Sequence, residues 1–323
     1  MRVLLTGSSG WLGRFLAPRL RAAGHFVTGL DVAPGTDTAV IGTVADRALV
    51  DQVFAEYEID AVIHSGALHK PDIARYPTQA FIDVNVTGTL NLLEAAVAAK
   101  ASRFIFTSTT SLMISERIRR AEGEAAVWID ETMAPLEPRN IYGVTKLAAE
   151  HLCRLYHQLH GLPCLILRTG RFFPEDDDTH AQPAGDNLKT NELLNRRLTV
   201  EDAARAHVMA LDRAPQLGFD TFILSAPIPF QQDEAKALKE DPAAVIARHF
   251  PEAAALYASR GWVLPATIDR VYDPGHAERA LGFRCTTGFA QALAALRDDR
   301  PSPLLHDPSY TSPKERPSVT RIN

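Results

Sequence analysis

Short apolar runs alternate with amphipathic segments along the first half of the chain, and this alternation constrains the fold more than any other feature. The apolar runs are nearly uninterrupted, as in strands that are buried on both faces of a sheet. They fall at Val3–Leu5, 25–31, 60–67, 103–109 and 163–169. Helical patterns lie between them at Trp11–Ala23, Arg47–Tyr57, Thr78–Lys100 and Tyr142–His160. Strands that alternate with helices form a parallel sheet with crossover helices on both faces, so the sequence predicts an α/β, doubly wound fold.

The regularity weakens after Arg168, which indicates a smaller C-terminal region. Residues 174–187 are rich in Asp, Pro and Gly and are expected to form a loop. Helices are expected within 198–214, 242–258 and 286–297, and a late strand at 221–226. From Pro301 onward the chain is rich in proline and poor in apolar residues. We therefore expect a tail that is extended, or that is ordered only by packing on a partner.

Composition excludes several classes of function. The net charge of −5 comes without a basic run or interleaved aromatic residues, which argues against nucleic acid as a partner. No apolar stretch approaches the roughly 20 residues of a membrane-spanning helix, and the first residues form a strand pattern and not a signal peptide. The cysteines, Cys153, Cys164 and Cys285, show no C-x-x-C spacing, and the histidines show no metal-ligand spacing. We therefore expect a cytoplasmic protein with small buried thiols and with neither disulfides nor a metal site.

The first strand ends in "TGSSGWLG" (6–13), a G-x-x-G-x-x-G pattern that opens the first helix. Gly7 permits the tight turn out of the strand, Gly10 lets the backbone approach a pyrophosphate, and Gly13 lets the helix pack close to the sheet. The phosphates would lie at the helix N-terminus, against free N–H groups and the positive end of the helix dipole. The pattern predicts dinucleotide binding; the structural alternative is a glycine-rich turn without a ligand.

The second strand ends at Asp31, 18 residues after Gly13. An acidic residue there accepts hydrogen bonds from the adenosine ribose hydroxyls and repels the 2′-phosphate of NADP. No arginine follows directly, since the next residues are "VAP" (32–34). The sequence therefore favours NAD over NADP.

The segment "NIYGVTKLAAEHL" (140–152) places Tyr142 and Lys146 four residues apart, on one face of a helix. An ammonium one turn from a phenol would lower the pKa of Tyr142 from about 10, so that Tyr142 exchanges a proton with a substrate hydroxyl. The preceding strand ends in "FIFTSTTS" (104–111), a cluster of hydroxyls at the carboxyl end of a parallel strand, where ligands bind. A hydroxyl there would hold the substrate oxygen during hydride transfer.

With these motifs the chain resembles the extended short-chain dehydrogenase/reductases, the family that includes sugar-nucleotide epimerases and dehydratases. The motifs that match, in order, are "TGSSGWLG" (6–13), Asp31, "HSGA" (64–67), "NVTGTLNLLEAA" (85–96), "FIFTST" (104–109), "YGVTK" (142–146), "LR" (167–168) and "VEDAARAH" (200–207). The resemblance implies a Rossmann domain of residues 1–168, to which 198–226 return. It implies a substrate-binding region of 169–197 and 227–300, which leaves 301–323 as the tail.

The resemblance also implies the site residues. Thr109, Tyr142 and Lys146 take the catalytic positions, with Tyr142 as the acid/base. Asn85 supports the active-site helix, and Thr169 and Gly170 flank the nicotinamide. The residues expected to contact NAD are Gly7, Gly10, Trp11, Leu12, Gly13, Asp31, Ser65, Gly66, Ala67, Asn85, Thr107, Tyr142, Lys146 and Thr169.

Family members commonly form homodimers in which two helices of each subunit build a four-helix bundle. In this chain those helices would be 80–100 and 142–160. Their apolar positions fit such a bundle, and they fit packing on the sheet alone equally well.

The chain departs from the family pattern on the substrate side. Thr43 stands where many relatives have an Asp that contacts adenine, and Asp46 is expected to cap the next helix. Arg171 replaces an Asn that helps to hold the substrate diphosphate, and an arginine binds a phosphate or a carboxylate. The candidate substrate residues are His69, Thr110, Arg171 and Arg197. The alternatives are a loop role for His69 and surface salt bridging for the Arg196–Arg197 pair.

Three functions fit these residues. The first is an NAD-dependent epimerase or dehydratase that acts on a sugar or nucleotide-sugar and keeps its cofactor bound. The second is a dehydrogenase or reductase of a free sugar, a sugar acid or a small ketone, with a cofactor that exchanges. The third is a catalytically silent NAD-binding protein, which the retention of Thr109, Tyr142 and Lys146 disfavours.

Overall fold

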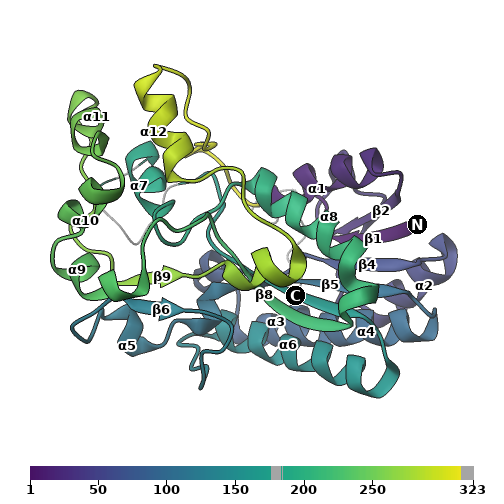
Figure 1. Cartoon of the computed structure of the whole chain (residues 1–323). Coiled ribbons are helices and arrows are strands. Elements are labelled where there is room, and N and C mark those ends of the chain that lie inside the picture. Colours follow the sequence, from purple (N-terminus) through teal and green to yellow (C-terminus); the bar gives the residue numbers. More distant parts are fainter. Residues whose placement is uncertain (176–182, 184, 314–323) are drawn as a thin grey trace.

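A seven-stranded, fully parallel sheet forms the centre of the computed structural model, which describes residues 1–175, 183 and 185–313 (Figure 1). The strands lie in the order β3-β2-β1-β4-β5-β7-β8. Their bounds are β1 (Arg2–Thr6), β2 (Phe26–Asp31), β3 (Val40–Ile41), β4 (Ala61–His64), β5 (Arg103–Thr109), β7 (Cys164–Thr169) and β8 (Phe219–Leu224). The predicted doubly wound parallel sheet is confirmed, because the order reverses direction between β1 and β4.

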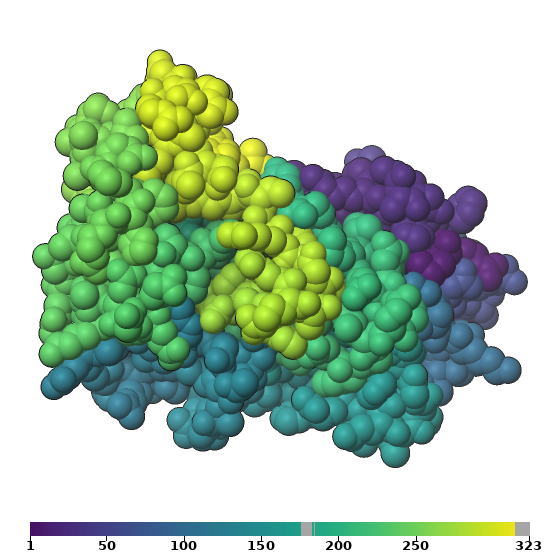
Figure 2. Space-filling view, viewed as in Figure 1, coloured from purple at the N-terminus to yellow at the C-terminus, as the bar shows by residue number. Residues whose placement is uncertain are grey.

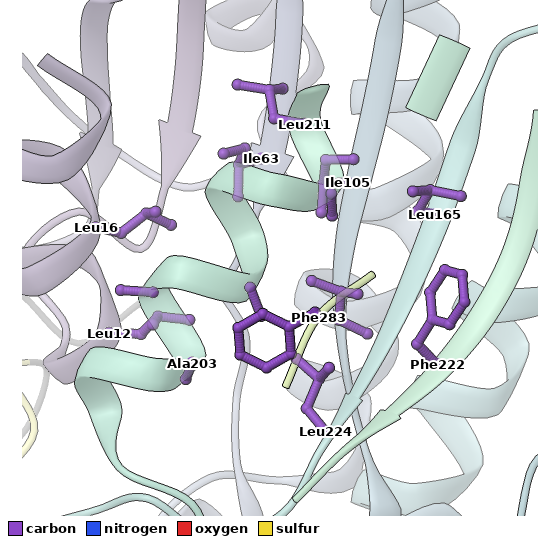
Figure 3. Close-up of a cluster of buried hydrophobic side chains, with 14 of the residues drawn as sticks. Leu12, Leu16, Ile63, Ile105, Leu165, Ala203, Leu211, Phe222, Leu224 and Phe283 are labelled. Carbon is purple, nitrogen blue, oxygen red and sulfur yellow. The ribbon is translucent and has the colours of Figure 1, made fainter. Parts of the chain in front are cut away.

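Helices cover both faces of the sheet, as predicted. α1 (Trp11–Ala22) and α8 (Val200–Leu217) pack on one face, and α2 (Arg47–Tyr57), α4 (Gly88–Ala98) and α6 (Ile141–His160) pack on the other. Figure 3 shows the first of these two cores, in which side chains of α1 and α8 meet the strands. The labelled strand residues there are Ile63, Ile105, Leu165, Phe222 and Leu224. Both faces of the central strands are therefore buried, which explains their nearly uninterrupted apolar runs.

The helical stretch predicted at Thr78–Lys100 is not a single α-helix. It consists of α3 (Thr78–Phe81), a π-helical segment (Ile82–Thr87) and α4. A π-helical turn widens the helix locally and re-aims the side chains around it. Here it places Asn85 inside the protein, at 2% exposure.

A smaller region stands at one end of the sheet and contains a second, two-stranded parallel sheet of β6 (Val127–Ile129) and β9 (Arg270–Tyr272). Its helices are α5 (Glu116–Arg119), α7 (Gly185–Glu192), α9 (Ala235–Glu240), α10 (Pro242–His249), α11 (Ala253–Ser259) and α12 (Phe289–Arg297). Figure 2 shows this region, mostly green and yellow, opposite the purple N-terminal residues.

Several expectations for the smaller region need correction. The helix expected at 242–258 is broken at Phe250–Pro251, because proline cannot donate to the preceding turn. The strands β6 and β9 and the helix α9 were not predicted. Most of the loop expected at 174–187 lies outside the described residues, and its last residues already belong to α7.

The described part of the tail, 301–313, contains no helix longer than one turn and no strand, and it packs on its own chain. Leu304 is buried in the core of the smaller region, against residues such as Phe289 and Leu293. The expectation that only a partner would order the tail is therefore wrong for 301–313. Residues 314–323 lie outside the described residues.

The structure shows the state of the cysteines and the length and apolarity of the helices. All three cysteines are buried and free, as predicted for small apolar side chains. Among the described residues, no helix has the length and apolarity needed to cross a membrane.

Candidate active site

A cavity of about 330 Å³ opens at the carboxyl ends of β1, β2, β4 and β5. In a doubly wound sheet this is the edge where ligands bind. Ten residues predicted to contact cofactor or substrate line it: Gly7, Gly10, Trp11, Leu12, Asp31, Ser65, Gly66, Ala67, His69 and Thr107. The structure therefore brings together residues from four separate segments of the sequence in one cavity.

The glycine-rich turn is built around contacts that no side chain would permit. Gly7 has φ +73°, and a Cβ on it would lie 2.8 Å from the backbone nitrogen of Gly66. A Cβ on Gly13 would lie 2.3 Å from the carbonyl oxygen of Gly7. The backbone of the turn therefore excludes a side chain at Gly13. This differs from the prediction, in which close packing of the helix on the sheet required the glycine.

Gly10 is the N-cap residue of α1, and among the described residues no side chain caps this end of the helix. Uncapped N–H groups at a helix N-terminus attract anions. Trp11, the first helical residue, lines the cavity, and its buried Nε1 has no hydrogen-bond acceptor among the described residues. A buried donor left without an acceptor costs about 1–3 kcal/mol, so an acceptor bound here would remove that cost. This end of the cavity fits a pyrophosphate group.

Asp31 stands at the end of β2, where it lines the cavity. Its Oδ2 accepts from Ser9 N at 2.9 Å and its Oδ1 accepts from Ala33 N at 3.1 Å. A carboxylate at the end of this strand accepts hydrogen bonds from the ribose hydroxyls of a bound dinucleotide. Thr43 also lines the cavity, whereas Asp46 accepts from Leu49 N and caps α2 as predicted. The donor and acceptor set at this end fits the adenosine half of a dinucleotide.

The His64 imidazole joins the glycine-rich turn to α4. Its Nδ1 lies 2.7 Å from Thr6 Oγ1 and its Nε2 lies 3.1 Å from Thr89 Oγ1. Because the Thr89 hydroxyl donates to the carbonyl of Asn85, it accepts from Nε2, which leaves Nδ1 to accept from Thr6. Burial lowers the pKa of His64 to about 3, so the ring is neutral at physiological pH.

This buried histidine predicts a loss of stability in acid. An unfolded histidine binds a proton near pH 6.5, whereas folded His64 does so only near pH 3, so the unfolded state binds more protons between these values. His64 therefore contributes stability above pH 6.5 that is lost as the pH falls, by up to about 1.4 kcal/mol per pH unit. We expect His64→Asn to flatten the dependence of the free energy of unfolding on pH between pH 6 and 4. The measurement is urea denaturation at several pH values.

The control for that series is His160→Asn, at an exposed position at the end of α6. Its slope should equal that of the wild type. An unchanged slope in His64→Asn would mean that His64 is protonated in the folded protein.

The structure brings the proposed catalytic residues together beside the cavity. Thr109, at the end of β5, lies close enough to Tyr142, on the first turn of α6, for its hydroxyl to act against the rise in the pKa of the phenol. The Tyr142 ring is 8% exposed and lies edge-on to His69, with 5.8 Å between the ring centroids. Since His69 lines the cavity, the phenol adjoins the cavity wall, although Tyr142 does not itself line it. His69 also lies 5.8 Å from Phe173 between ring centroids, so this candidate substrate residue lies beside the cavity as predicted.

The expectation that Lys146 lowers the pKa of Tyr142 is wrong for this structure. Burial raises the pKa of Tyr142 to about 12, against the opposing effect of the Thr109 hydroxyl, and the Asp72 carboxylate raises it further. The Lys146 Nζ instead donates to the carbonyl of Thr107 at 2.6 Å and lies 4.0 Å above the Phe106 ring. Burial lowers the pKa of Lys146 to about 7, and the Glu150 carboxylate opposes that shift.

Thr107 connects the cavity to α8. Its hydroxyl lies 2.8 Å from His207 Nε2. Because His207 Nδ1 donates to the carbonyl of Ala203 at 2.7 Å, Nε2 accepts from the Thr107 hydroxyl. Burial lowers the pKa of His207 to about 4, which keeps this acceptor neutral.

Three residues predicted to contact ligand lie behind the cavity wall. Asn85 uses its amide on the backbone of Leu68 and donates to Thr145 Oγ1 at 3.1 Å, so it braces α6 and does not line the cavity. Thr169 Oγ1 donates to the carbonyl of Ser108, and Thr110 Oγ1 donates to the carbonyl of Thr169. Both hydroxyls are buried and serve the backbone.

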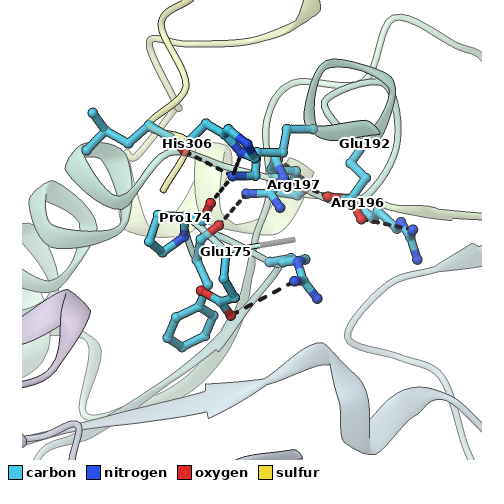
Figure 4. A network of polar contacts seen from close by, with 11 residues as sticks. Pro174, Glu175, Glu192, Arg196, Arg197 and His306 are labelled. Carbon is cyan, nitrogen blue, oxygen red and sulfur yellow. Dashed lines mark hydrogen bonds and ion pairs between the residues drawn. The ribbon is translucent and has the colours of Figure 1, made fainter. Parts of the chain in front are cut away.

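The arginines of the substrate side form a charged network between the end of β7 and α7 (Figure 4). Arg197 is 2% exposed and lies 2.7 Å from Glu192 Oε2, and Arg196 lies 2.9 Å from Glu192 Oε1. Burial works to raise the pKa of Glu192, but these arginines hold it below its usual value. The alternative of salt bridging therefore holds for Arg196 and Arg197. The expected place was wrong, because the bridges are buried and not on the surface. Arg197 is not placed as a substrate contact, because it is buried away from the cavity and bonds Glu192 and the carbonyl of Phe173.

Arg171 remains the better placed of the two candidate arginines. Its side chain is 26% exposed and lies 4.0 Å from Glu175, whose pKa is raised by burial. The two residues after it, Phe172 and Phe173, stack at 4.8 Å and line the cavity. These phenylalanines were not predicted, although their position directly after a strand end was an available signal.

A buried ion pair under the site was also not predicted. Arg168 of β7 bonds Glu150 of α6 through Nε at 3.0 Å and Nη2 at 2.7 Å. Ser108 of β5 donates to the same carboxylate at 2.5 Å. The pair joins the active-site helix to two strands, one turn along from Lys146.

Two curated proteins that resemble this chain are named as enzymes that act on sugars or nucleotide-sugars. A probable UDP-glucuronate 4-epimerase of Rhizobium meliloti is 29% identical over 187 residues, 52% of this chain and 52% of that protein. An L-arabinose 1-dehydrogenase (NAD(P)(+)) of Haloferax volcanii is 31% identical over 182 residues, 54% of this chain and 69% of that protein. The match thus spans about half the length of the epimerase relative.

Solved structures show the same fold over nearly the whole chain. The UDP-glucose 4-epimerase of Thermus thermophilus, in complex with NAD, superimposes with a TM-score of 0.61 at 22% identity. The superposition covers 92% of this chain and 99% of that one. The sequence profile of the NAD dependent epimerase/dehydratase family matches residues 3–219, which hold the glycine-rich turn, Asp31 and the Thr109–Tyr142–Lys146 group. The chain therefore belongs to the NAD-dependent epimerase/dehydratase family of extended short-chain dehydrogenase/reductases.

Proposed function

We propose that this protein uses NAD to transfer a hydride at a secondary hydroxyl or keto carbon of a sugar or nucleotide-sugar, with Tyr142 as the acid/base. The observation that carries the proposal is the place of Tyr142 beside the cavity, edge-on to His69, with Thr109 close to its phenol and Lys146 one turn along the same helix.

Different residues would bind the different parts of NAD. The uncapped start of α1 and Trp11 would hold the pyrophosphate, Asp31 the adenosine ribose, and Thr107 and Lys146 the nicotinamide half. When bound, NAD supplies the hydride acceptor and donor, so the protein has to supply only orientation and proton transfer. The repulsion between the Asp31 carboxylate and a 2′-phosphate favours NAD over NADP.

Tyr142 moves the proton. With its pKa raised to about 12, the phenol is protonated at neutral pH and is ready to donate to a carbonyl oxygen. To accept a proton from a substrate hydroxyl, Tyr142 first has to lose its own proton. Positive charge close to the phenol favours that loss. The Thr109 hydroxyl, which lies close to the phenol, would hold the same substrate oxygen. His69, edge-on to the Tyr142 ring, is the nearest further proton-transfer group.

The substrate would lie toward the smaller region. We propose that residues 1–168 and 198–226 bind NAD and that 169–197 and 227–300 bind the substrate, with the partly exposed Arg171 facing an anionic group of it. The name of the Rhizobium relative supports a nucleotide-sugar with a carboxylate, and a guanidinium binds carboxylate and phosphate alike.

A dehydrogenase or reductase with an exchanging cofactor is the second candidate. The Haloferax L-arabinose 1-dehydrogenase, at 31% identity, supports it and points to a free sugar as the substrate. A non-catalytic NAD-binding protein is the third, and the conjunction of Thr109, Tyr142 and Lys146 in the structure speaks against it.

The test is to purify the protein, denature it, and identify and count the nicotinamide nucleotide that is released. Near-stoichiometric NAD supports an epimerase or dehydratase, and nucleotide-sugars are then assayed first. An empty protein that binds added NAD supports the dehydrogenase, and free sugars, sugar acids and small ketones follow. Recovery of NADP would overturn the interpretation of Asp31.

We propose further that the protein is a cytoplasmic homodimer, held by a four-helix bundle of α4 and α6 from each subunit. The apolar side chains of Val144, Leu155 and Leu159 are 45%, 43% and 65% exposed along one face of α6. On α4, Leu93 is buried in the core of the sheet, so it is not available for the bundle. Three free buried thiols fit a reducing compartment. Light scattering of the purified protein, which has a chain mass of 35.4 kDa, tests the dimer.

A further inference from the structure

The described tail, residues 301–313, runs from the smaller region to the cofactor cavity. It starts beside α12, where Leu304 is 5% exposed. Further along, Asp307 N donates to the carbonyl of Pro174, in the segment that follows β7, at 3.0 Å. At its far end, Ser312 and Pro313 line the cavity together with the glycine-rich turn. The tail therefore spans the two parts of the molecule between which a substrate and a cofactor would meet.

A buried lysine anchors the middle of the tail through Pro174 and His306, which are labelled in Figure 4. Lys189 of α7 is 1% exposed, and its Nζ donates to the carbonyl of Pro174. The same Nζ lies 3.3 Å from the carbonyl of Leu305 and 2.7 Å from His306 Nδ1, which accepts from it. An ammonium has three donors, and these acceptors come from the tail and from the segment after β7. The path of the tail is thus fixed well before it reaches the cavity.

The tail meets the phosphate end of the cavity through an aromatic pair. The ring of Tyr310 lies 5.1 Å from that of Trp11, at an interplanar angle of 60°, and Trp11 contacts Phe15 on its own helix at 5.2 Å. Trp11 is the first residue of α1, directly after Gly10. Tyr310 therefore holds a residue that lines the cavity where the pyrophosphate is expected to bind.

We propose that residues 310–313 form a wall of the NAD site and slow the release of NAD, with Tyr310 as the residue that positions Trp11. This inference rests on the proposed function only in that the cavity binds NAD. A cofactor that leaves past Ser312 and Pro313 has to separate the tail from Trp11, so the aromatic contact adds to the barrier for release. Aromatic pairs of this kind stabilise by amounts that correspond to roughly 2- to 10-fold in a rate.

The experiment measures the dissociation rate of NADH, the reduced cofactor, by stopped-flow fluorescence after mixing the NADH complex with excess ADP-ribose. We expect Tyr310→Ala to accelerate release about 2- to 10-fold. A chain that ends at Ser309 keeps Leu304, His306 and Asp307 in place but loses Tyr310 and both lining residues. We expect it to release NADH faster than Tyr310→Ala does. Because the probe is added cofactor, the result does not depend on whether NAD is retained during turnover.

Two substitutions serve as controls. Tyr310→Phe keeps the ring and should release NADH at the wild-type rate, and Thr311→Ala changes an exposed neighbour and should do the same. Thermal unfolding without cofactor shows whether a variant is merely destabilised. Equal release rates in the wild type and in the folded Ser309-terminated chain would overturn the proposal. If neither the wild type nor any variant binds NADH, the proposed function is wrong as well. If all of them bind NADH and release it at the same rate, only the proposed role of the tail is wrong.

Discussion

Replacing Tyr142 with phenylalanine is expected to lower kcat by about 10²- to 10⁴-fold, the range that a positioned general acid/base contributes. The substitution removes the hydroxyl and leaves the aromatic ring in its cluster with Leu68 and Phe81. Since Tyr142 does not line the cavity, NAD should bind the variant with unchanged affinity. Steady-state kinetics on the substrate found in the assays, together with a titration of NADH fluorescence, measure the two quantities separately.

Tyr257→Phe is the matched control for this experiment. Tyr257 is 1% exposed in the smaller region, and its hydroxyl has no hydrogen-bond partner among the described residues. Removing that hydroxyl should leave kcat unchanged. If Tyr142→Phe retained wild-type turnover, the proton would be moved by another group, and His69 would be the first to examine.

Glu150→Gln is expected to lower the free energy of unfolding by about 3–5 kcal/mol, because it leaves the Arg168 guanidinium buried without a counter-charge. Both side chains are less than a tenth exposed, and the carboxylate accepts from Arg168 and from Ser108. The loss should show as a lower midpoint in urea denaturation. The substitution should also lower the pKa of Lys146, one turn away on α6, because the Glu150 carboxylate raises that pKa against the effect of burial.

A second arginine–carboxylate pair in the same protein provides the comparison. Arg47 and Asp51 form an exposed i,i+4 pair at 2.9 Å on α2, with half of each side chain in solvent. Asp51→Asn should leave the urea midpoint nearly unchanged, because water solvates the arginine that remains. An equally small effect of Glu150→Gln would show that water reaches Arg168 when its partner is removed.

The large sheet could be predicted from the sequence because its signals are local. Each strand is a short apolar run with a turn at its end, and each helix lies between two such runs. The smaller region offers no such signals: β6 and β9 have three residues each and acquire a partner only from a distant part of the chain. Pro251 was a usable signal for the break between α10 and α11, since proline ends a helix at the preceding turn.

The site was predictable where a motif fixes both the residue type and its position. Gly7, Asp31 and Thr107 line the cavity as the motifs required. Burial was not predictable, and it decides the remaining cases. It raises the pKa of Tyr142 where an adjacent lysine suggested the opposite, and it turns Arg197 from a candidate ligand contact into one half of an internal ion pair.

The β6–β9 sheet also determines when this chain can finish folding during synthesis. Its strands are roughly 140 residues apart, so β6 leaves the ribosome on the order of 10 s before β9 does. Most of the large sheet is complete by β8, and its strands need nothing from the last hundred or so residues to pair. The nascent chain therefore passes through a stage in which the strands of the large sheet can pair while β6 has no partner strand. The two-stranded sheet of the smaller region is the last to form, and until then β6 presents an unpaired strand edge.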